Sequence, residues 1–274
     1  TYTRESVEAA LAAGLLDEKA IDAATRHVLT AKVASRLFEV PFTDESLQTD
    51  AFDTAANRAL AHAAAVEGIV LLKNEKAALP LSAAAAPKLA VLGELGASLD
   101  AARGATLGSY TQDDGKIRVD SLCTAAKREP GFGSVECIGG AGPDRAANAT
   151  EVAAAAAVAA RADVVVLVLG ESTHTCGEWA DRADLDLPGG QLDLLNAASA
   201  AAAANGATVV LLLLGGRPLT FGAAEGNVAL DGVAAILWAG RPGEEGANAA
   251  IDLLLGRASP SAKLPASWPR EVGH

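Results

Sequence analysis

The chain has 274 residues, of which 50% are hydrophobic and 20% charged, and its formal net charge is −12 at pH 7. This length suits one large or two ordinary domains, and the apolar fraction is too high for a mainly disordered chain. The acidic balance argues against a nucleic-acid partner or an anionic membrane surface, since both require a basic face. No run of about 18 uncharged apolar residues occurs, so we expect no membrane-spanning segment.

Three observations bear on the origin and location of the chain. It starts at Thr1 and contains no methionine, which we interpret as a segment of a longer protein whose targeting signal lies elsewhere. Cys123 and Cys137 bracket a turn that contains Gly and Pro, and both a disulfide and two free thiols fit this spacing. Asn148-Ala-Thr150 is a glycosylation sequon in a polar stretch. We therefore expect an extracellular or periplasmic location.

The first 70 residues predict helices joined by a linker. One helix runs from Glu5 to Ala13 and stops at Gly14, and a second opens at Asp17 and continues to about residue 38. Residues 41–50 are polar without periodicity, which is typical of a surface segment. A third helix is predicted over residues 54–67, ahead of the apolar run 68–72.

The pattern then changes to short apolar runs that each end near a glycine, at residues 88–92, 163–169, 207–214 and 232–238. Helical stretches are predicted between and after them, at 150–161, 189–203 and 244–255. Continuous apolar strands that alternate with helices indicate an α/β fold, a mostly parallel sheet with helices on both faces. In such sheets the chemistry lies in the loops beyond the carboxyl ends of the strands, here 93–110, 170–188, 215–219 and 239–246.

The loop 170–188 has the densest set of reactive side chains: Glu171, His174, Cys176, Glu178, Trp179, Asp181, Arg182 and Asp184. A carboxylate acts as a general acid when apolar neighbours raise its pKa, and Trp179 beside Glu178 can supply that surface or stack on a sugar ring. Asp181 or Arg182 can orient the loop or bind hydroxyl groups. The alternative is a solvated polar loop with local salt bridges. The irregular spacing of mixed ligands argues against a metal site, and we expect none.

A nucleotide site is a further alternative for this fold. Gly93-Glu-Leu-Gly96 follows a predicted strand and resembles half of a dinucleotide-binding loop. However, Ser98 stands where the third glycine belongs, and no acidic partner for a ribose follows a strand at the required distance. We therefore expect no cofactor.

Several blocks in fixed order resemble one known family. They are residues 24–42, residues 62–74 with Leu79-Pro-Leu81, Gly177-Glu-Trp-Ala-Asp-Arg182 with the residues up to Gln191, residues 238–246, and residues 256–269. Together they resemble the C-terminal half of a glycoside hydrolase family 3 enzyme, the group of β-glucosidases and β-xylosidases. The resemblance implies four regions: the last helices of a truncated (β/α) barrel domain at 1–42, a linker at 43–57, an α/β sandwich domain at 58–270, and the start of a missing C-terminal extension at 271–274.

The resemblance also implies an activity. It is that of a retaining exo-acting β-D-glycosidase that hydrolyses terminal non-reducing β-glucosides or β-xylosides with two carboxylates. Glu178 matches the family's general acid/base, Glu171 is the second choice, and Trp179, Asp181 and Arg182 match positions that bind substrate or position the loop. The implied partners are a glycoside substrate and the barrel domain, which belongs to the same chain or to a second polypeptide.

Because the barrel holds the nucleophile in this family, we expect the chain as given to be inactive alone. The alternative function is that of a non-catalytic carbohydrate- or partner-binding α/β domain of the same fold.

Overall fold

The computed structural model describes residues 3–47, 51–111, 115, 117–222 and 230–273. The chain divides into two compact units, Thr1–Thr54 and Ala55–His274. The first unit carries helices α1 (Arg4–Ala12) and α2 (Glu18–Ala34). Neither helix has a buried residue, and the apolar side chains of Val28, Leu29 and Val33 in α2 lie exposed.

Both N-terminal helices were predicted, and local hydrogen bonds explain where each begins. The Thr3 hydroxyl accepts a hydrogen bond from the backbone N–H of Ser6, and the Asp17 carboxylate accepts one from Ala20. Helix α2 ends at Ala34, four residues before the predicted end, because the chain turns at Arg36 with a φ of 55°. A positive φ is incompatible with a continuing right-handed helix.

The described residues of the second unit form a sheet of six strands in the order β1-β6-β5-β4-β2-β3. Only β1 runs antiparallel, against β6, and the other pairs are parallel. The strand bounds are β1 Val70–Asn74, β2 Lys88–Leu92, β3 Ser134–Ile138, β4 Val164–Gly170, β5 Thr208–Leu214 and β6 Ala235–Gly240. The predicted α/β class with a mostly parallel sheet is thus confirmed.

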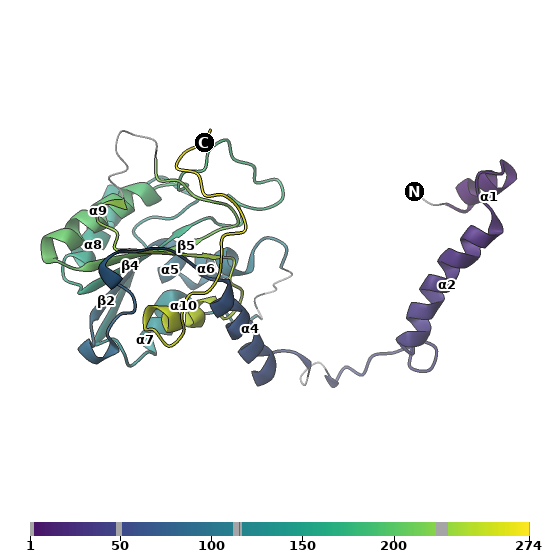
Figure 1. Ribbon diagram of the computed structural model, residues 1–274, viewed down its shortest axis with the longest axis horizontal. Helices are drawn as coiled ribbons and strands as arrows, with labels where there is room; N and C mark the ends of the chain where they lie inside the picture. The colour runs from purple at the N-terminus through teal and green to yellow at the C-terminus, as the bar shows by residue number, and fades with distance from the viewer. Residues whose placement is uncertain (1–2, 48–50, 112–114, 116, 223–229, 274) are drawn as a thin grey trace. The chain divides into compact units, whose positions relative to one another are not determined.

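Helices cover both faces of this sheet (Figure 1). Helices α8 (Ala149–Ala159) and α9 (Gln191–Asn205) lie on one face, and α4 (Ala55–Gly68), α7 (Leu122–Lys127) and α10 (Gly246–Leu254) lie on the other. The short α5 (Glu94–Ala97) and α6 (Leu99–Leu107) follow β2.

Two apolar cores result, one on each side of the sheet. In β4, Val165 and Leu167 belong to the core under α8 and α9, whereas Val164 and Val166 belong to the other core. All seven residues of β4 are buried. Burial on both faces explains why this strand reads as a continuous apolar run.

The segment between β2 and β4 was least predictable. No helix or strand was predicted from the sequence at α5, α6, α7 or β3. Strand β3 lies at the edge of the sheet and is only partly buried, so it lacks the apolar run that marks the inner strands. The structure also resolves the cysteine alternative, because Cys123 in α7 forms a disulfide with Cys137 in β3.

The glycines at the end of β2 have a packing role. A Cβ atom at Gly96 would lie 2.6 Å from Cγ2 of Val168, and one at Gly93, where φ is 98°, would lie 2.4 Å from the Val168 carbonyl oxygen. Both positions therefore need glycine for close approach to β4. The glycine pattern thus gives no support to a nucleotide site.

Candidate active site

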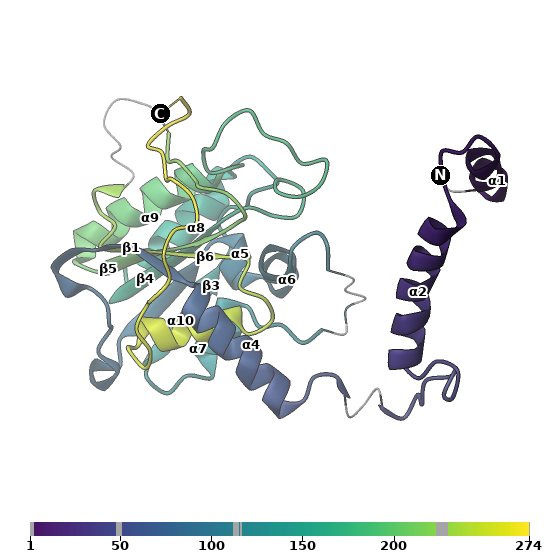
Figure 2. The same ribbon diagram turned by 45° about the vertical axis from the view of Figure 1, so that its right-hand side comes forward.

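The carboxyl ends of β4, β5 and β6 meet at one edge of the sheet. Gly170 pairs with Leu214, and Leu214 pairs with Gly240. The residues that follow these three strands therefore emerge side by side, where parallel sheets place their ligand-binding loops. Figure 2 shows the loop after β4, in teal to green, extending away from this edge.

The base of the loop is closed by Gln191. Its side chain is fully buried, its Oε1 accepts a hydrogen bond from the Gly170 N–H at 2.8 Å, and its Nε2 donates to the carbonyl oxygens of Gly170 (2.7 Å) and Pro188 (2.8 Å). Gly170 has a φ of 143°, and a Cβ atom there would lie 1.7 Å from the Leu214 carbonyl oxygen. One amide group therefore joins the two ends of the loop.

Glu171 lies inside the protein. Its side chain is 0% exposed, and its Oε1 lies 3.0 Å from Nε of Arg217 and 3.4 Å from Nη1 of Arg182. The backbone N–H of Glu171 donates to the Leu214 carbonyl oxygen at 2.9 Å. Burial between two guanidinium groups gives this carboxylate an ion-pairing role at the base of the loop.

Glu178 lies at the tip and is exposed. Within the described residues its carboxylate takes part in no hydrogen bond or ion pair. The neighbouring Trp179 is 93% exposed and has a φ of 66°, a conformation rare for a bulky side chain. The tip therefore presents a carboxylate and an indole ring to the outside.

The other predicted site residues divide between the buried base and the exposed tip of the loop. Arg182 points inward, where its Nη2 donates to Oδ1 of Asp184 at 2.8 Å and to the Asp186 carbonyl oxygen. Asp181 is exposed at the tip. His174 is exposed, with its Nδ1 3.4 Å from Oδ2 of Asp144. The geometry thus gives Arg182 a bracing role and leaves Asp181 open to solvent.

Three contributors were missed by the sequence analysis. Arg217 follows β5 and donates from Nη2 to the Ala180 carbonyl oxygen at 3.3 Å, and Arg241 follows β6 and donates to the Cys176 carbonyl oxygen at 2.8 Å. Asp144 accepts a hydrogen bond from the Ser172 hydroxyl at 2.6 Å. Both arginines lie in strand-end loops where chemistry was expected, but nothing in the sequence shows which loop they reach.

The side chains of this loop that could ligate a metal, Glu171, His174, Cys176 and Glu178, do not form a metal site. Glu171 faces arginines inside the protein, whereas Glu178 and His174 are exposed. Across the described ranges, no group of three or more His, Cys, Asp or Glu side chains is arranged to hold a metal ion. Nor does any described helix combine the length and the apolar character that crossing a bilayer requires.

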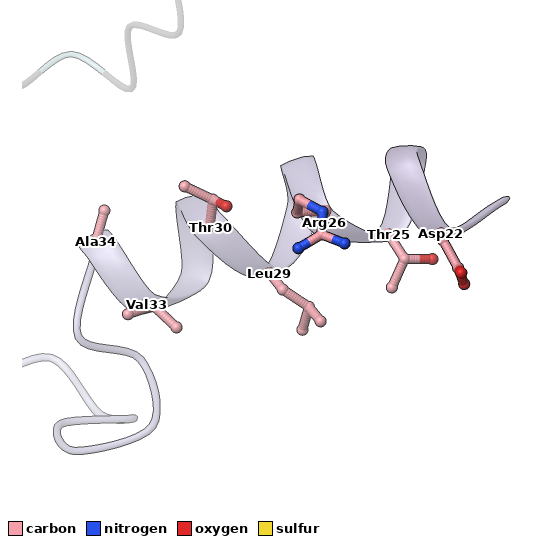
Figure 3. A pocket seen from close by; sticks show the side chains of 7 residues that line it. All are labelled: Asp22, Thr25, Arg26, Leu29, Thr30, Val33 and Ala34. Carbon is pink, nitrogen blue, oxygen red and sulfur yellow. The ribbon is translucent and has the colours of Figure 1, made fainter. Parts of the chain in front are cut away.

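A separate hollow of about 620 Å³ lies on the first unit and is lined by residues of α2. They are Asp22, Thr25, Arg26, Leu29, Thr30, Val33 and Ala34 (Figure 3). A single helix cannot enclose a ligand. This hollow is therefore not a candidate for the active site.

Comparison with known proteins identifies the class to which this fold and loop belong. Residues 69–274 match the Glycosyl hydrolase family 3 C-terminal domain. Beta-D-xylosidase 1 of Arabidopsis thaliana is 33% identical over 264 residues, which cover 95% of this chain and 32% of the plant protein. A beta-xylosidase of Formosa agariphila is 33% identical over 257 residues, covering 93% of this chain and 34% of the relative.

Solved structures of beta-glucosidases are also similar to this chain. The beta-glucosidase from Listeria innocua in complex with isofagomine has a TM-score of 0.79 and 30% identity, covering 97% of this chain and 35% of that one. The chain belongs to glycosyl hydrolase family 3. It carries that family's C-terminal domain and spans about a third of the length of these relatives. The predicted family is thus confirmed.

Proposed function

We propose that this chain supplies the general acid/base carboxylate, Glu178, of a retaining exo-acting β-D-glycosidase. The observation that carries the proposal is the difference between the two candidate carboxylates. Glu178 is exposed at the tip of the loop, whereas Glu171 is buried between two arginines. A group that exchanges protons with a substrate has to reach it, and Glu178 has this access.

The proposed reaction has two steps. In the first, a nucleophilic carboxylate attacks the anomeric carbon while Glu178 gives its proton to the departing glycosidic oxygen. In the second, the Glu178 carboxylate removes a proton from water, and the resulting hydroxide equivalent releases the sugar with net retention of configuration. The nucleophile is assigned to a barrel domain, in the same polypeptide or in a partner, so the chain as given is proposed to be inactive alone.

The proposed substrates are terminal non-reducing β-xylosides and β-glucosides. This assignment rests on the names of the relatives, which are beta-xylosidases and beta-glucosidases. The indole of Trp179 supplies an apolar face beside Glu178, suited to stacking on a sugar ring. The Cys123–Cys137 disulfide supports an extracellular or periplasmic location, because disulfides persist in oxidising compartments.

The substitution Glu178→Gln tests the proposal in a polypeptide that joins the barrel domain to these residues. Loss of the acid should lower kcat/KM for aryl glycosides with poor leaving groups by about 10²–10⁴-fold. Dinitrophenolate leaving groups need no protonation, so glycosides that carry them should form the glycosyl-enzyme at most of the original rate. Added azide should restore turnover of the glycosyl-enzyme and yield a β-glycosyl azide.

A matched control is Asp231→Asn, which changes an exposed carboxylate ahead of the amino end of β6. This variant should keep the rates of the unsubstituted protein. Equal rates for Glu178→Gln and Asp231→Asn on every substrate would refute the proposed role of Glu178 and leave the chain with the non-catalytic binding function.

A further inference from the structure

The two residues that flank the tip of the loop symmetrically are each held by an arginine. Cys176 precedes Glu178 by two positions, and its carbonyl oxygen accepts a hydrogen bond from Arg241 at 2.8 Å. Ala180 follows Glu178 by two positions, and its carbonyl oxygen accepts one from Arg217 at 3.3 Å. The exposed carboxylate therefore lies between two fixed points of the backbone.

Arg241 binds two segments of the chain at once. Its Nη2 also donates to the Ser172 carbonyl oxygen at 3.3 Å, and its Nη1 donates to the carbonyl oxygens of Gly104 (3.3 Å) and Ala105 (3.0 Å) in α6. Within the described part of the chain Arg241 forms no ion pair. The described hydrogen bonds of its planar guanidinium group thus all go to backbone carbonyl groups, a geometry that lysine cannot reproduce.

Close contacts show that the first arm of the loop is packed against the end of α6. A Cβ atom at Gly177 would lie 2.6 Å from Oγ of Ser109, and one at Gly108, where φ is 85°, would lie 2.9 Å from Cδ of Arg241. Gly108 therefore leaves the space through which the Arg241 side chain passes. The contact between Gly177 and Ser109 and the hydrogen bonds of Arg241 thus fix the same arm independently.

The second arm is fixed through the buried carboxylate. Oε1 of Glu171 lies 3.0 Å from Nε of Arg217, and the same guanidinium reaches the Ala180 carbonyl oxygen. A charged hydrogen bond of this kind restricts the orientation of the arginine. Glu171 therefore acts on the tip through Arg217.

We propose that Arg241 and Arg217 are positioning residues that hold the Glu178 carboxylate at its working place by binding the backbone on either side of it. This inference rests on the proposed function of Glu178. A general acid has to lie within hydrogen-bond reach of the leaving oxygen, and a displacement of about 1 Å can cost about 10²-fold in rate. Neither arginine needs to touch the substrate for this effect.

The test uses Arg241→Met in the polypeptide that joins the barrel domain to these residues, because methionine keeps an apolar stem and removes every donor. We expect kcat/KM for phenyl glycosides to fall by about 10–100-fold and that for dinitrophenyl glycosides by less than about threefold. Arg241→Lys should recover a minor part of the loss. Arg161→Met, which removes an exposed arginine at the end of α8, is the matched control and should change neither rate.

This leaving-group dependence separates positioning from stability. A loss of folded protein lowers both rates by the same factor, whereas a misplaced acid lowers the rate of the substrate that needs protonation. Suppose that Glu178→Gln shows the selective loss. The inference is then overturned if Arg241→Met lowers kcat/KM for both substrates by the same factor, or for neither. A Glu178→Gln variant without selective loss would instead overturn the proposed function and the inference with it.

Fluorescence of Trp179 gives a second readout in residues 1–274 themselves. The other two tryptophans, Trp238 and Trp268, pack edge to face with ring centroids 5.5 Å apart. The difference in emission between each protein and its Trp179→Phe counterpart therefore reports on the tip. Arg241→Met should lower the anisotropy of this difference signal, and unchanged anisotropy would contradict the anchoring role.

Discussion

The base and the tip of the loop after β4 differ in almost every physical respect, although Glu171 and Glu178 are separated by only seven positions. At the base, Glu171 and Gln191 are fully buried and hydrogen-bonded to fixed partners. At the tip, Glu178 and Trp179 are exposed. The difference teaches that the two carboxylates have opposite tasks, one to fix the loop and the other to remain accessible.

Removal of the buried charge should have the largest effect on stability. Glu171→Gln leaves Arg182 and Arg217 without their buried counter-charge, and breaking such a pair typically costs about 3–5 kcal/mol in the free energy of unfolding. Urea unfolding followed by circular dichroism measures this change. A loss below about 1 kcal/mol would show that the base does not depend on the ion pairs.

Gln191→Met should have the next largest effect. Methionine fills a similar volume but leaves the Gly170 N–H and the carbonyl groups of Gly170 and Pro188 without their buried partner. We expect a loss of about 2–4 kcal/mol, since an unsatisfied buried group costs about 1–3 kcal/mol. Faster hydrogen exchange at the Gly170 amide, with unchanged exchange in α10, would locate the effect at the base of the loop.

Removal of a partly exposed ion pair elsewhere in the second unit should lower the free energy of unfolding by an intermediate amount. The Arg257 guanidinium and the backbone N–H of Gly131 hold the pKa of Glu129 below its ordinary value of 4.5. A lowered pKa means that the stabilisation is complete above pH 4.5 and is lost as the pH falls through the lower, folded-state value. Because the Arg257 side chain is 47% exposed, Glu129→Gln should cost about 0.5–1 kcal/mol at pH 7 and less at pH 3.

The smallest effect is expected at the tip. Glu178→Gln should change the free energy of unfolding by less than about 0.5 kcal/mol, because the carboxylate is exposed and takes part in no described interaction. Thermal unfolding in parallel with Glu171→Gln makes the contrast direct. A large loss in Glu178→Gln would place this side chain in the structural framework and weaken its proposed catalytic role.

The fold could be predicted to the extent that burial leaves a pattern in the sequence. The inner strands are buried on both faces and read as continuous apolar runs, as Val164–Gly170 does. The edge strand Ser134–Ile138 has one exposed side, so it lacks a continuous apolar run, and it was missed. Helices 94–97 and 99–107 are short and rich in small residues, and their large apolar side chains, Leu95, Leu99 and Leu107, are too few to reveal a helical period.

The loop that carries the site could be located from the sequence, but the contacts that bury Glu171 and hold the tip could not be predicted. Reactive residues clustered after one apolar run pointed to the loop at 170–188, and the family resemblance selected Glu178. The separation between a buried Glu171 and an exposed Glu178 depends on Arg217 and Arg241, which come from two other strands. Such contacts are set by strand order, which the spacing of residues along one loop does not encode.

The hydrogen bonds of Arg241 and Arg217 have one further consequence. Both arginines follow strands of the same sheet from which the loop emerges, so the flanks of the tip lose their conformational entropy when that sheet folds. A sugar or another domain that binds at the tip then meets a preorganised backbone, and association carries little further ordering cost. Affinity at this edge should accordingly show a small unfavourable entropy, in contrast to binding by a loop that orders on contact.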